Sequence, residues 1–211
     1  MIKEVLNFLK NPVRFEEYTP MKAKDFFILL FAVLIVIIPY ALILDSLDLQ
    51  FDNMIEELMR DYKWVVVIGA VILAPLLEEP AFRMHLDYKK SSFFWGIGLA
   101  LLFMSELWYI PLAYMGYLFY CWMQVKENNP PNLKFVVYTS AAFFGLVHLG
   151  NYQNVDWSQY FYFMPILVLA QFGLGLVLSF IRMKHGLKYA IFFHGAYNAI
   201  ILIPSAIWGD F

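Results

Sequence analysis

Residues 64–83, WVVVIGAVILAPLLEEPAFR, decide how this chain folds. The run from Trp64 to Leu77 carries no charge, and the adjacent glutamates Glu78 and Glu79 and then Arg83 follow it. A helix of about 20 mostly apolar residues is long enough to cross the hydrocarbon core of a bilayer. Ionisable side chains at such depth are costly, and they usually have a function there. The stretch therefore predicts a membrane-spanning helix that carries a functional polar cluster.

The composition places the whole chain in the membrane class. Hydrophobic residues make up 62% of the 211 positions and charged residues 15%, whereas soluble domains have roughly 45–50% and 25%. The chain has no linker-like or low-complexity segment and no clear repeat, so residues 1–211 are expected to form one membrane-embedded domain. The net charge of −2 argues against a nucleic-acid partner. The single cysteine, Cys121, excludes an intramolecular disulfide.

The hydrophobic runs predict an all-α, polytopic bundle of about seven membrane-spanning helices. The third and fourth runs are short and are separated only by Glu106, so six or eight spans are alternatives. The seven predicted spans are residues 26–44, 63–84, 93–105, 107–125, 135–150, 160–181 and 187–208.

The distribution of basic residues predicts the orientation of the bundle. Residues 1–24 mix acidic and basic side chains and lack the apolar core of a signal peptide, so they are expected to be a cytosolic or interfacial lead-in to an uncleaved first span. With the amino terminus in the cytosol, all of the 15 basic residues except Arg60 and Lys63 fall on the cytosolic side. This pattern is typical of a multi-pass protein of the cell membrane.

The two adjacent glutamates are expected to have different roles. Successive helical residues point about 100° apart, so Glu78 and Glu79 cannot face the same spot. Glu79 and Arg83 are one turn apart and can form an ion pair. This pairing leaves Glu78 free for chemistry. Pro75 and Pro80 flank the pair and disturb the helix, which membrane proteins tolerate where the segment is packed in protein or lines a wet cavity. The alternative is a purely structural ion pair, with Glu78 reaching toward the cytosol.

Further polar residues interrupt the fifth and seventh predicted spans. His148 ends the fifth span, one turn after Phe144, and His194 and Asn198 share one face of the seventh. Each histidine on its own is as compatible with a hydrogen-bonded packing residue as with a catalytic one. Helix geometry places His148 about 20 Å from the start of its span, deeper than Glu78 or His194, so we expect this helix to begin outside the membrane.

Together these residues resemble the CPBP family, which comprises the CAAX proteases and bacteriocin-processing enzymes and is also called Abi. Residues 78–83 fit its Glu-Glu-x-x-x-Arg motif, 144–148 fit Phe-x-x-x-His, and 194–198 fit His-x-x-x-Asn. The resemblance covers approximately residues 64–205. The 70 residues from Glu78 to His148 leave room for an inserted helical hairpin at 93–125.

The resemblance implies a glutamate-dependent intramembrane endopeptidase that cleaves a membrane-associated protein or peptide. Glu78 would be the general base, and His148 would position or polarise the attacking water. His194 and Asn198 would donate hydrogen bonds to the oxyanion. Glu79 and Arg83 would support them by orienting the helix and tuning Glu78. No cofactor is expected.

A zinc-dependent version of this chemistry is the less favoured alternative. Two histidines and one glutamate match a catalytic zinc ligand set, yet no two of the four histidines are four residues apart, as a His-Glu-x-x-His helix requires. The resemblance also points to a metal-independent enzyme. The remaining histidines, His85 and His185, lie beside basic loop residues and are expected at the membrane interface.

Two functions of other classes stay open at this point. A noncatalytic immunity or scaffolding protein of the membrane could keep the polar cluster for helix packing or binding. A proton-coupled carrier could use Glu78 and the histidines as a relay, although the chain is short for such a transporter.

Overall fold

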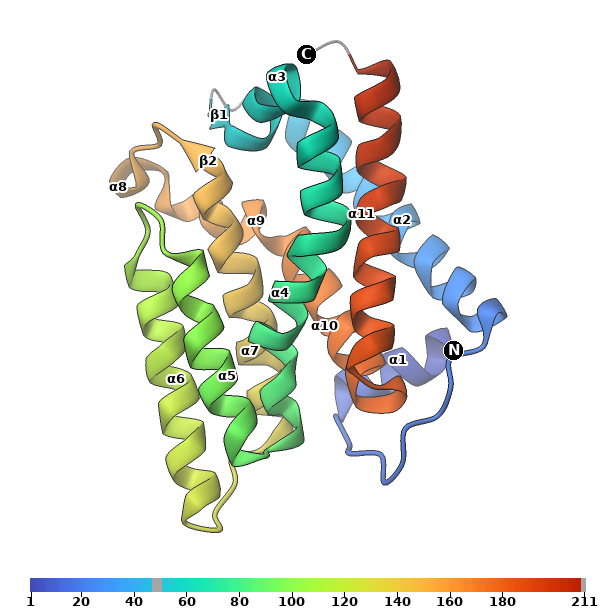
Figure 1. Ribbon diagram of the computed structural model, residues 1–211, viewed down its shortest axis with the longest axis vertical. Coiled ribbons are helices and arrows are strands. Elements are labelled where there is room, and N and C mark those ends of the chain that lie inside the picture. Colours follow the sequence, from blue (N-terminus) through green and yellow to red (C-terminus); the bar gives the residue numbers. More distant parts are fainter. Residues whose placement is uncertain (47–50, 210–211) are drawn as a thin grey trace.

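The computed structural model describes residues 1–46 and 51–209, most of which are helical (Figure 1). The long helices are α1 (Ile2–Lys10), α2 (Ala23–Ser46), α3 (Met54–Ile68), α4 (Ala74–Arg83), α5 (Lys90–Ala100), α6 (Tyr109–Lys126), α7 (Leu133–Val147), α10 (Leu169–His185) and α11 (Leu187–Trp208). The short helices are α8 (Trp157–Tyr160) and α9 (Met164–Leu167). A π-helical turn (Gly69–Leu73) joins α3 to α4, and 3₁₀ turns occur at Met84–Asp87, Leu101–Phe103, His148–Asn151 and Phe161–Phe163.

The predicted all-α class is confirmed. One sheet is present in the described part of the chain, an antiparallel pair of two-residue strands, β1 (Asp52–Asn53) and β2 (Tyr152–Gln153). It ties the segment after α2 to the segment after α7, at the end of the bundle where α3 begins (Figure 1).

Four helices in the described residues are long and apolar enough to cross a membrane, namely Ala23–Leu44, Met54–Asp87, Leu133–Asn151 and Leu187–Trp208. These coincide with the first, second, fifth and seventh predicted spans. The third predicted span corresponds to α5 and the 3₁₀ turn that follows it, which together form a shorter apolar helix. The fourth predicted span corresponds to α6. The chain is therefore a helical membrane protein, and six of the seven predicted spans lie on helices.

The sixth predicted span, residues 160–181, is not one continuous helix. The chain forms α8, a 3₁₀ turn and α9 and then turns at Val168 into α10, with a bend of 41° between Trp157–Leu167 and Leu169–His185. Pro165 lies in the first turn of α9, where its missing N–H is tolerated, but it cannot continue a helix that comes before it. Counted as one broken span, this pair would be a fifth crossing.

Side chains of α6 and α7 hold the end of α4. There the helix tightens into the 3₁₀ turn Met84–Asp87, so carbonyl groups near its end need donors from elsewhere. The phenol of Tyr114 donates to the Ala81 carbonyl at 2.8 Å, and the Ser140 hydroxyl donates to the Phe82 carbonyl. Phe82 itself is fully buried and stacks on Tyr114. This packing fixes α4, which carries the glutamates, against its neighbours.

Polar contacts gather many of the residues assigned to the cytosolic side at one end of the bundle. Lys184 Nζ lies 2.7 Å from a carboxylate oxygen of Glu4, which joins the end of α10 to α1. Arg182 pairs with Asp87 at 3.4 Å, and Lys134 Nζ donates to the Lys10 carbonyl at 3.1 Å. The side of the membrane on which this end lies stays a prediction.

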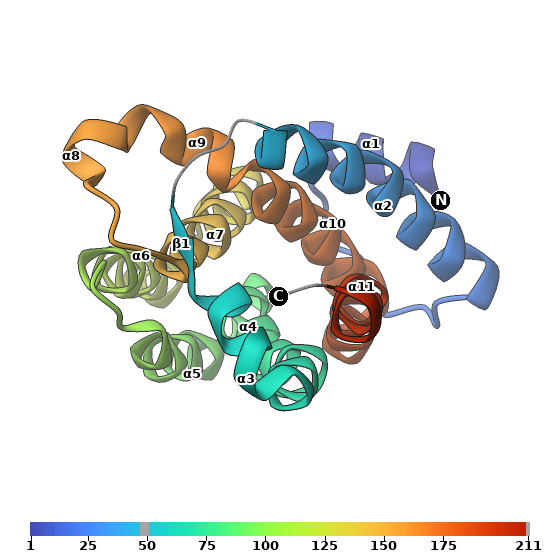
Figure 2. The same cartoon turned by 90° about the horizontal axis from the view of Figure 1, so that it is seen from above.

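The helices pack around α4, α7, α10 and α11, with the other elements outside them. Viewed from above, α5 and α6 lie on one side, and α1 and α2 lie against α10 on the opposite side (Figure 2). The lead-in predicted for residues 1–24 contains α1, which buries Val5 and Phe8.

Candidate active site

Glu79 is the centre of the polar cluster. Its side chain is fully buried, and its Oε1 lies 2.9 Å from Arg83 Nη1 and 2.9 Å from His194 Nδ1. The expected one-turn pair of Glu79 and Arg83 is thus present, and His194 of α11 joins it. Because both members of the pair are buried, each depends on the other to compensate its charge.

The contact with Glu79 determines which nitrogen of His194 carries a proton. An ionised carboxylate only accepts hydrogen bonds, so His194 Nδ1 must be the donor. In the neutral ring the other nitrogen, Nε2, then has a free lone pair. Nε2 lies 3.8 Å from Oε2 of Glu78, which is too long for a direct hydrogen bond. A separation of this length suits groups that share a water or a substrate atom.

Glu78 faces this gap with an unused oxygen. Its side chain is 14% exposed, and its Oε2 is buried without a hydrogen-bond partner among the described residues. The difference from Glu79 follows from the helix, since adjacent residues point about 100° apart. The cluster therefore contains one fully buried carboxylate, Glu79, whose Oε1 binds two partners while its Oε2 binds none in the described part of the chain, and one partly exposed carboxylate, Glu78, whose unpartnered Oε2 lies opposite His194.

Phe144 brings both histidines to the cluster. Its ring lies 3.8 Å below the Arg83 guanidinium, a cation–π contact, and 5.7 Å from the His194 ring. The His148 ring packs 4.8 Å from the same phenyl ring, and its Nδ1 donates to the Phe144 carbonyl at 2.6 Å. His148 is also near enough to Glu78 and His194 to interact electrostatically with them.

These contacts remove the difference in depth that the sequence suggests. Helical side chains tilt toward the amino-terminal end of their helix, so His148 points back along α7 to Phe144, and Arg83 points back along α4 to Glu79. Because Arg83 lies on Phe144, the His148 ring is brought to the level of the glutamates.

Asn198 lies farther along α11 and contacts backbone rather than the cluster. Its Nδ2 donates to the Ala70 carbonyl, in the π-helical turn, at 2.7 Å. That carbonyl lacks a backbone donor because the Ala74 N–H bonds to Gly69 and the next residue, Pro75, has no N–H. Asn198 therefore supplies the hydrogen bond that Pro75 cannot give.

Two glycines permit these close approaches. A Cβ on Gly195 would lie 2.6 Å from the Val71 carbonyl oxygen, so α11 could not approach the π-helical turn with a larger residue there. A Cβ on Gly175 would lie 3.0 Å from Arg83 Nη2 and 3.1 Å from the Phe144 ring. Small residues thus lie where helices meet around the site, as is common where helices of membrane proteins pack closely.

The sequence-predicted site residues therefore fall into two groups. The structure brings together Glu78, Glu79, Arg83, His148 and His194, and it places Asn198 one turn farther along α11 than His194, in contact with the π-helical turn. Sequence reasoning missed Phe144 as the ring shared by both histidines, although the motif contains it, and it missed Gly175 and the carbonyl of Ala70.

His85 and His185 are both buried within the protein, which the sequence did not predict, and their expected position at the membrane interface stays a prediction. His85 is fully buried among the rings of Phe93, Tyr114 and Tyr117. His185 packs near Phe180 and Tyr189, and its ring contacts the Thr19 carbonyl at 2.6 Å. The basic residues beside them in the sequence gave no sign of this burial.

No group of three His, Cys, Asp or Glu side chains in residues 1–46 and 51–209 is arranged to hold a metal ion. In the cluster, Nδ1 of His194 contacts Glu79 and Nδ1 of His148 contacts a carbonyl group. Of the histidine nitrogens, only the two Nε2 atoms could therefore act as metal ligands.

The fold and the cluster define a helical membrane protein with buried, hydrogen-bonded acidic and basic groups. Residues 60–200 match the family model described as type II CAAX prenyl endopeptidase Rce1-like. The chain belongs to this family, in agreement with the resemblance carried by the three motifs. No curated protein and no solved structure matches the chain.

Proposed function

We propose that this protein is an intramembrane endopeptidase that hydrolyses a peptide bond of a membrane-associated protein or peptide with a water activated by Glu78. One observation carries the proposal. Both glutamates have an Oε2 atom without a partner among the residues that the structure describes, but it is the Oε2 of Glu78, whose side chain is 14% exposed, that faces His194 Nε2 across 3.8 Å. An unused carboxylate oxygen opposite an imidazole suits general acid–base chemistry.

In the proposed first step a water lies between Glu78 and the substrate carbonyl. As the water oxygen bonds to the carbonyl carbon, one water proton passes to Glu78. His148 orients the water through Nε2, which is free to accept because Nδ1 donates to the Phe144 carbonyl. Glu78 then returns the proton to the leaving nitrogen as the C–N bond breaks.

His194 would stabilise the oxyanion in this scheme. Because Nδ1 already donates to Glu79, Nε2 can donate only if the ring is a doubly protonated imidazolium. Glu79, whose Oε1 contacts both Arg83 and His194 at 2.9 Å, is the carboxylate to which such a ring would donate from Nδ1. For Asn198 we propose a positioning role, since its contact with Ala70 holds the turn before the glutamates.

We further propose seven spans with a cytosolic amino terminus, in the cell membrane. The basic lead-in and the basic ends of α7 and α10 lie at the same end of the bundle, which supports one positively charged face. The family name suggests a prenylated peptide as the first substrate to try.

The test is Glu78→Gln, which keeps the shape of the side chain and removes the base. Purified wild-type protein and variant are compared for cleavage of a prenylated CAAX peptide, and membrane fractions of expressing cells are compared for new protein termini. We expect activity to fall about 10²- to 10⁴-fold, with an unchanged or raised Tm because the replaced carboxylate has an unpaired oxygen. Full activity of the variant would refute the assigned chemistry and favour a noncatalytic role.

Metal independence is a separate part of the proposal. Activity should survive prolonged dialysis against a zinc chelator and should not rise when zinc is added back. A loss that zinc restores would instead assign the Nε2 atoms of both histidines and Glu78 to a metal.

A further inference from the structure

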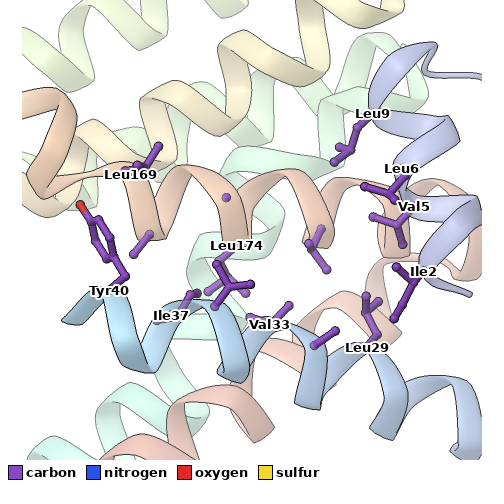
Figure 3. A pocket seen from close by; sticks show the side chains of 15 residues that line it. Ile2, Val5, Leu6, Leu9, Leu29, Val33, Ile37, Tyr40, Leu169 and Leu174 are labelled. Carbon is purple, nitrogen blue, oxygen red and sulfur yellow. The ribbon is translucent and has the colours of Figure 1, made fainter. Parts of the chain in front are cut away.

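A cavity lies outside the polar cluster, between α1, α2 and α10 (Figure 3). Its volume is about 280 Å³. Figure 3 shows its labelled side chains in a row along α10, with Tyr40 at one end and Ile2 at the other. The Tyr40 hydroxyl donates to the Ile166 carbonyl, so the polar group in the wall already has a partner. The rest of the lining is hydrocarbon, apart from backbone.

The residues deep in the cavity are buried, and those at its rim are exposed. Leu29 and Leu174 in its wall are 2% and 3% exposed, whereas Val36 and Leu169 are 67% and 52% exposed. Val36 belongs to α2, which is long and apolar enough to span a membrane. The cavity therefore opens on an exposed apolar surface formed in part by a candidate membrane span.

A glycine creates part of this space. Gly173 lines the cavity, and a Cβ built on it would meet no atom within 4 Å. An apolar cavity of roughly 150 Å³ can hold benzene, so this volume suits on the order of ten carbon atoms of a hydrocarbon chain. Since the walls offer no unpaired polar group, they select for an apolar guest.

We propose that this cavity binds one acyl chain of a membrane phospholipid. The bilayer supplies such chains at its mouth, and the apolar lining of the cavity matches them in polarity. Lys3 follows Ile2 directly in α1, at the end of the cavity that Ile2 marks, and would meet the lipid head group. The two helices that complete the cavity, α1 and α2, precede residue 60, where the family match begins.

The cavity is separated from the proposed catalytic groups by α10. Gly175 on this helix faces Arg83 and Phe144, and Gly173, two residues earlier, points about 200° away. A chain in the cavity therefore lies behind α10 as seen from Glu78. This position favours a resident phospholipid over a lipid group attached to the substrate.

The experiment compares Gly173→Leu with a matched control, Gly116→Leu. Gly116 is an exposed helical glycine of α6 and also has open space at its Cβ, but it does not line the cavity. The detergent-purified proteins are mixed with palmitoyl-oleoyl phosphatidylglycerol and examined by native mass spectrometry and by thermal unfolding. Wild type and Gly116→Leu should retain a phospholipid adduct and show a raised Tm, and Gly173→Leu should lose both.

Equal adducts, or equal loss, in the two glycine variants would overturn the proposal. If Gly173→Leu does not fold, Ala32→Phe fills the same cavity from α2 and must show the same loss. A short-chain phospholipid, dihexanoyl phosphatidylglycerol, should not replace the long-chain adduct. A different outcome is that a prenylated peptide raises the Tm, that phospholipid does not, and that Gly173→Leu abolishes this rise. The cavity would then bind the prenyl group of the substrate, and the resident-lipid proposal would fail.

The result is independent of catalysis. Glu78→Gln should keep the adduct and the lipid-dependent rise in Tm, because Glu78 lies on the other side of α10. Lipid binding without any protease activity would support the lipid site and refute the proposed function. Protease activity without lipid binding would support the proposed function and refute the lipid site.

Discussion

The side-chain amide of Asn198 donates to the backbone carbonyl of Ala70, 128 residues earlier in the chain. This contact compensates for Pro75, which has no N–H with which to close the π-helical turn. Glu78 follows three residues after Pro75. The position of the proposed base therefore depends on a hydrogen bond from another membrane span.

A double-mutant cycle tests whether Asn198 acts through this turn. Asn198→Ala leaves the Ala70 carbonyl unpaired and should cost about 1–3 kcal/mol of stability, with reduced activity. In a Pro75→Ala background the backbone provides a donor for that carbonyl, so both losses should shrink. The measurements are Tm in detergent and the rate of peptide cleavage.

The opposite outcome has a clear meaning. If Asn198→Ala lowers activity equally in both backgrounds and leaves Tm unchanged, Asn198 acts on the reaction itself. The oxyanion role that the family resemblance implies would then be supported.

The Glu79–Arg83 pair should behave as a buried ion pair. Arg83→Met leaves the Glu79 carboxylate with only His194 as a partner and should cost about 3–5 kcal/mol. Adding Glu79→Gln removes the uncompensated charge, so the double variant should be more stable than Arg83→Met alone. Thermal unfolding of the three proteins checks the order. A single variant as stable as wild type would mean that the pair contributes no stability.

Gly195→Ala should separate α11 from the π-helical turn. The new Cβ would lie 2.6 Å from the Val71 carbonyl oxygen, which is backbone and cannot rotate away. Overpacking of this kind costs about 1–3 kcal/mol, and it should also reduce cleavage because His194 is the preceding residue. Gly98→Ala is the control, since its Cβ meets nothing within 4 Å. Equal Tm values for the two variants would show that the helices adjust freely.

The sequence predicted the helical membrane class and the pairing of Glu79 with Arg83 because both depend on local spacing. Hydrophobic runs define spans, and a separation of four residues places Glu79 beside Arg83. The same argument explains why His148 and Phe144 meet on α7. The contact of His194 with Glu79 is different, since it depends on how α11 packs against α4.

The features that the sequence did not predict arise from helix irregularities and from packing. The π-helical turn at Gly69–Leu73 shifts the register before Glu78, and its free carbonyl determines what Asn198 contacts. The burial of His85 depends on aromatic rings from α5 and α6, which hydrophobicity alone does not position. The bend at Val168 required the geometry of α9 as well as the presence of Pro165.

The ion pair between Glu4 and Lys184 should add a small pH-dependent stability. The hydrogen bond from Lys184 is the largest influence on Glu4 and holds its pKa below the ordinary value of 4.5. A lowered pKa in the folded state stabilises the protein above the unfolded pKa, and this contribution is lost as the pH falls through the folded pKa. Because Glu4 is 53% exposed, solvent screening limits the effect to at most about 0.5 kcal/mol.

The measurement is the Tm difference between wild type and Glu4→Gln at neutral pH and at a pH well below 4.5. The difference should be present at neutral pH, vanish in acid and shrink in high salt, where surface charges are screened. Glu17→Gln, at an exposed position of the same lead-in, serves as the control and should show no such trend. A difference that persisted in acid would mean that Glu4 holds α1 on α10 by packing, because protonation removes only the charge.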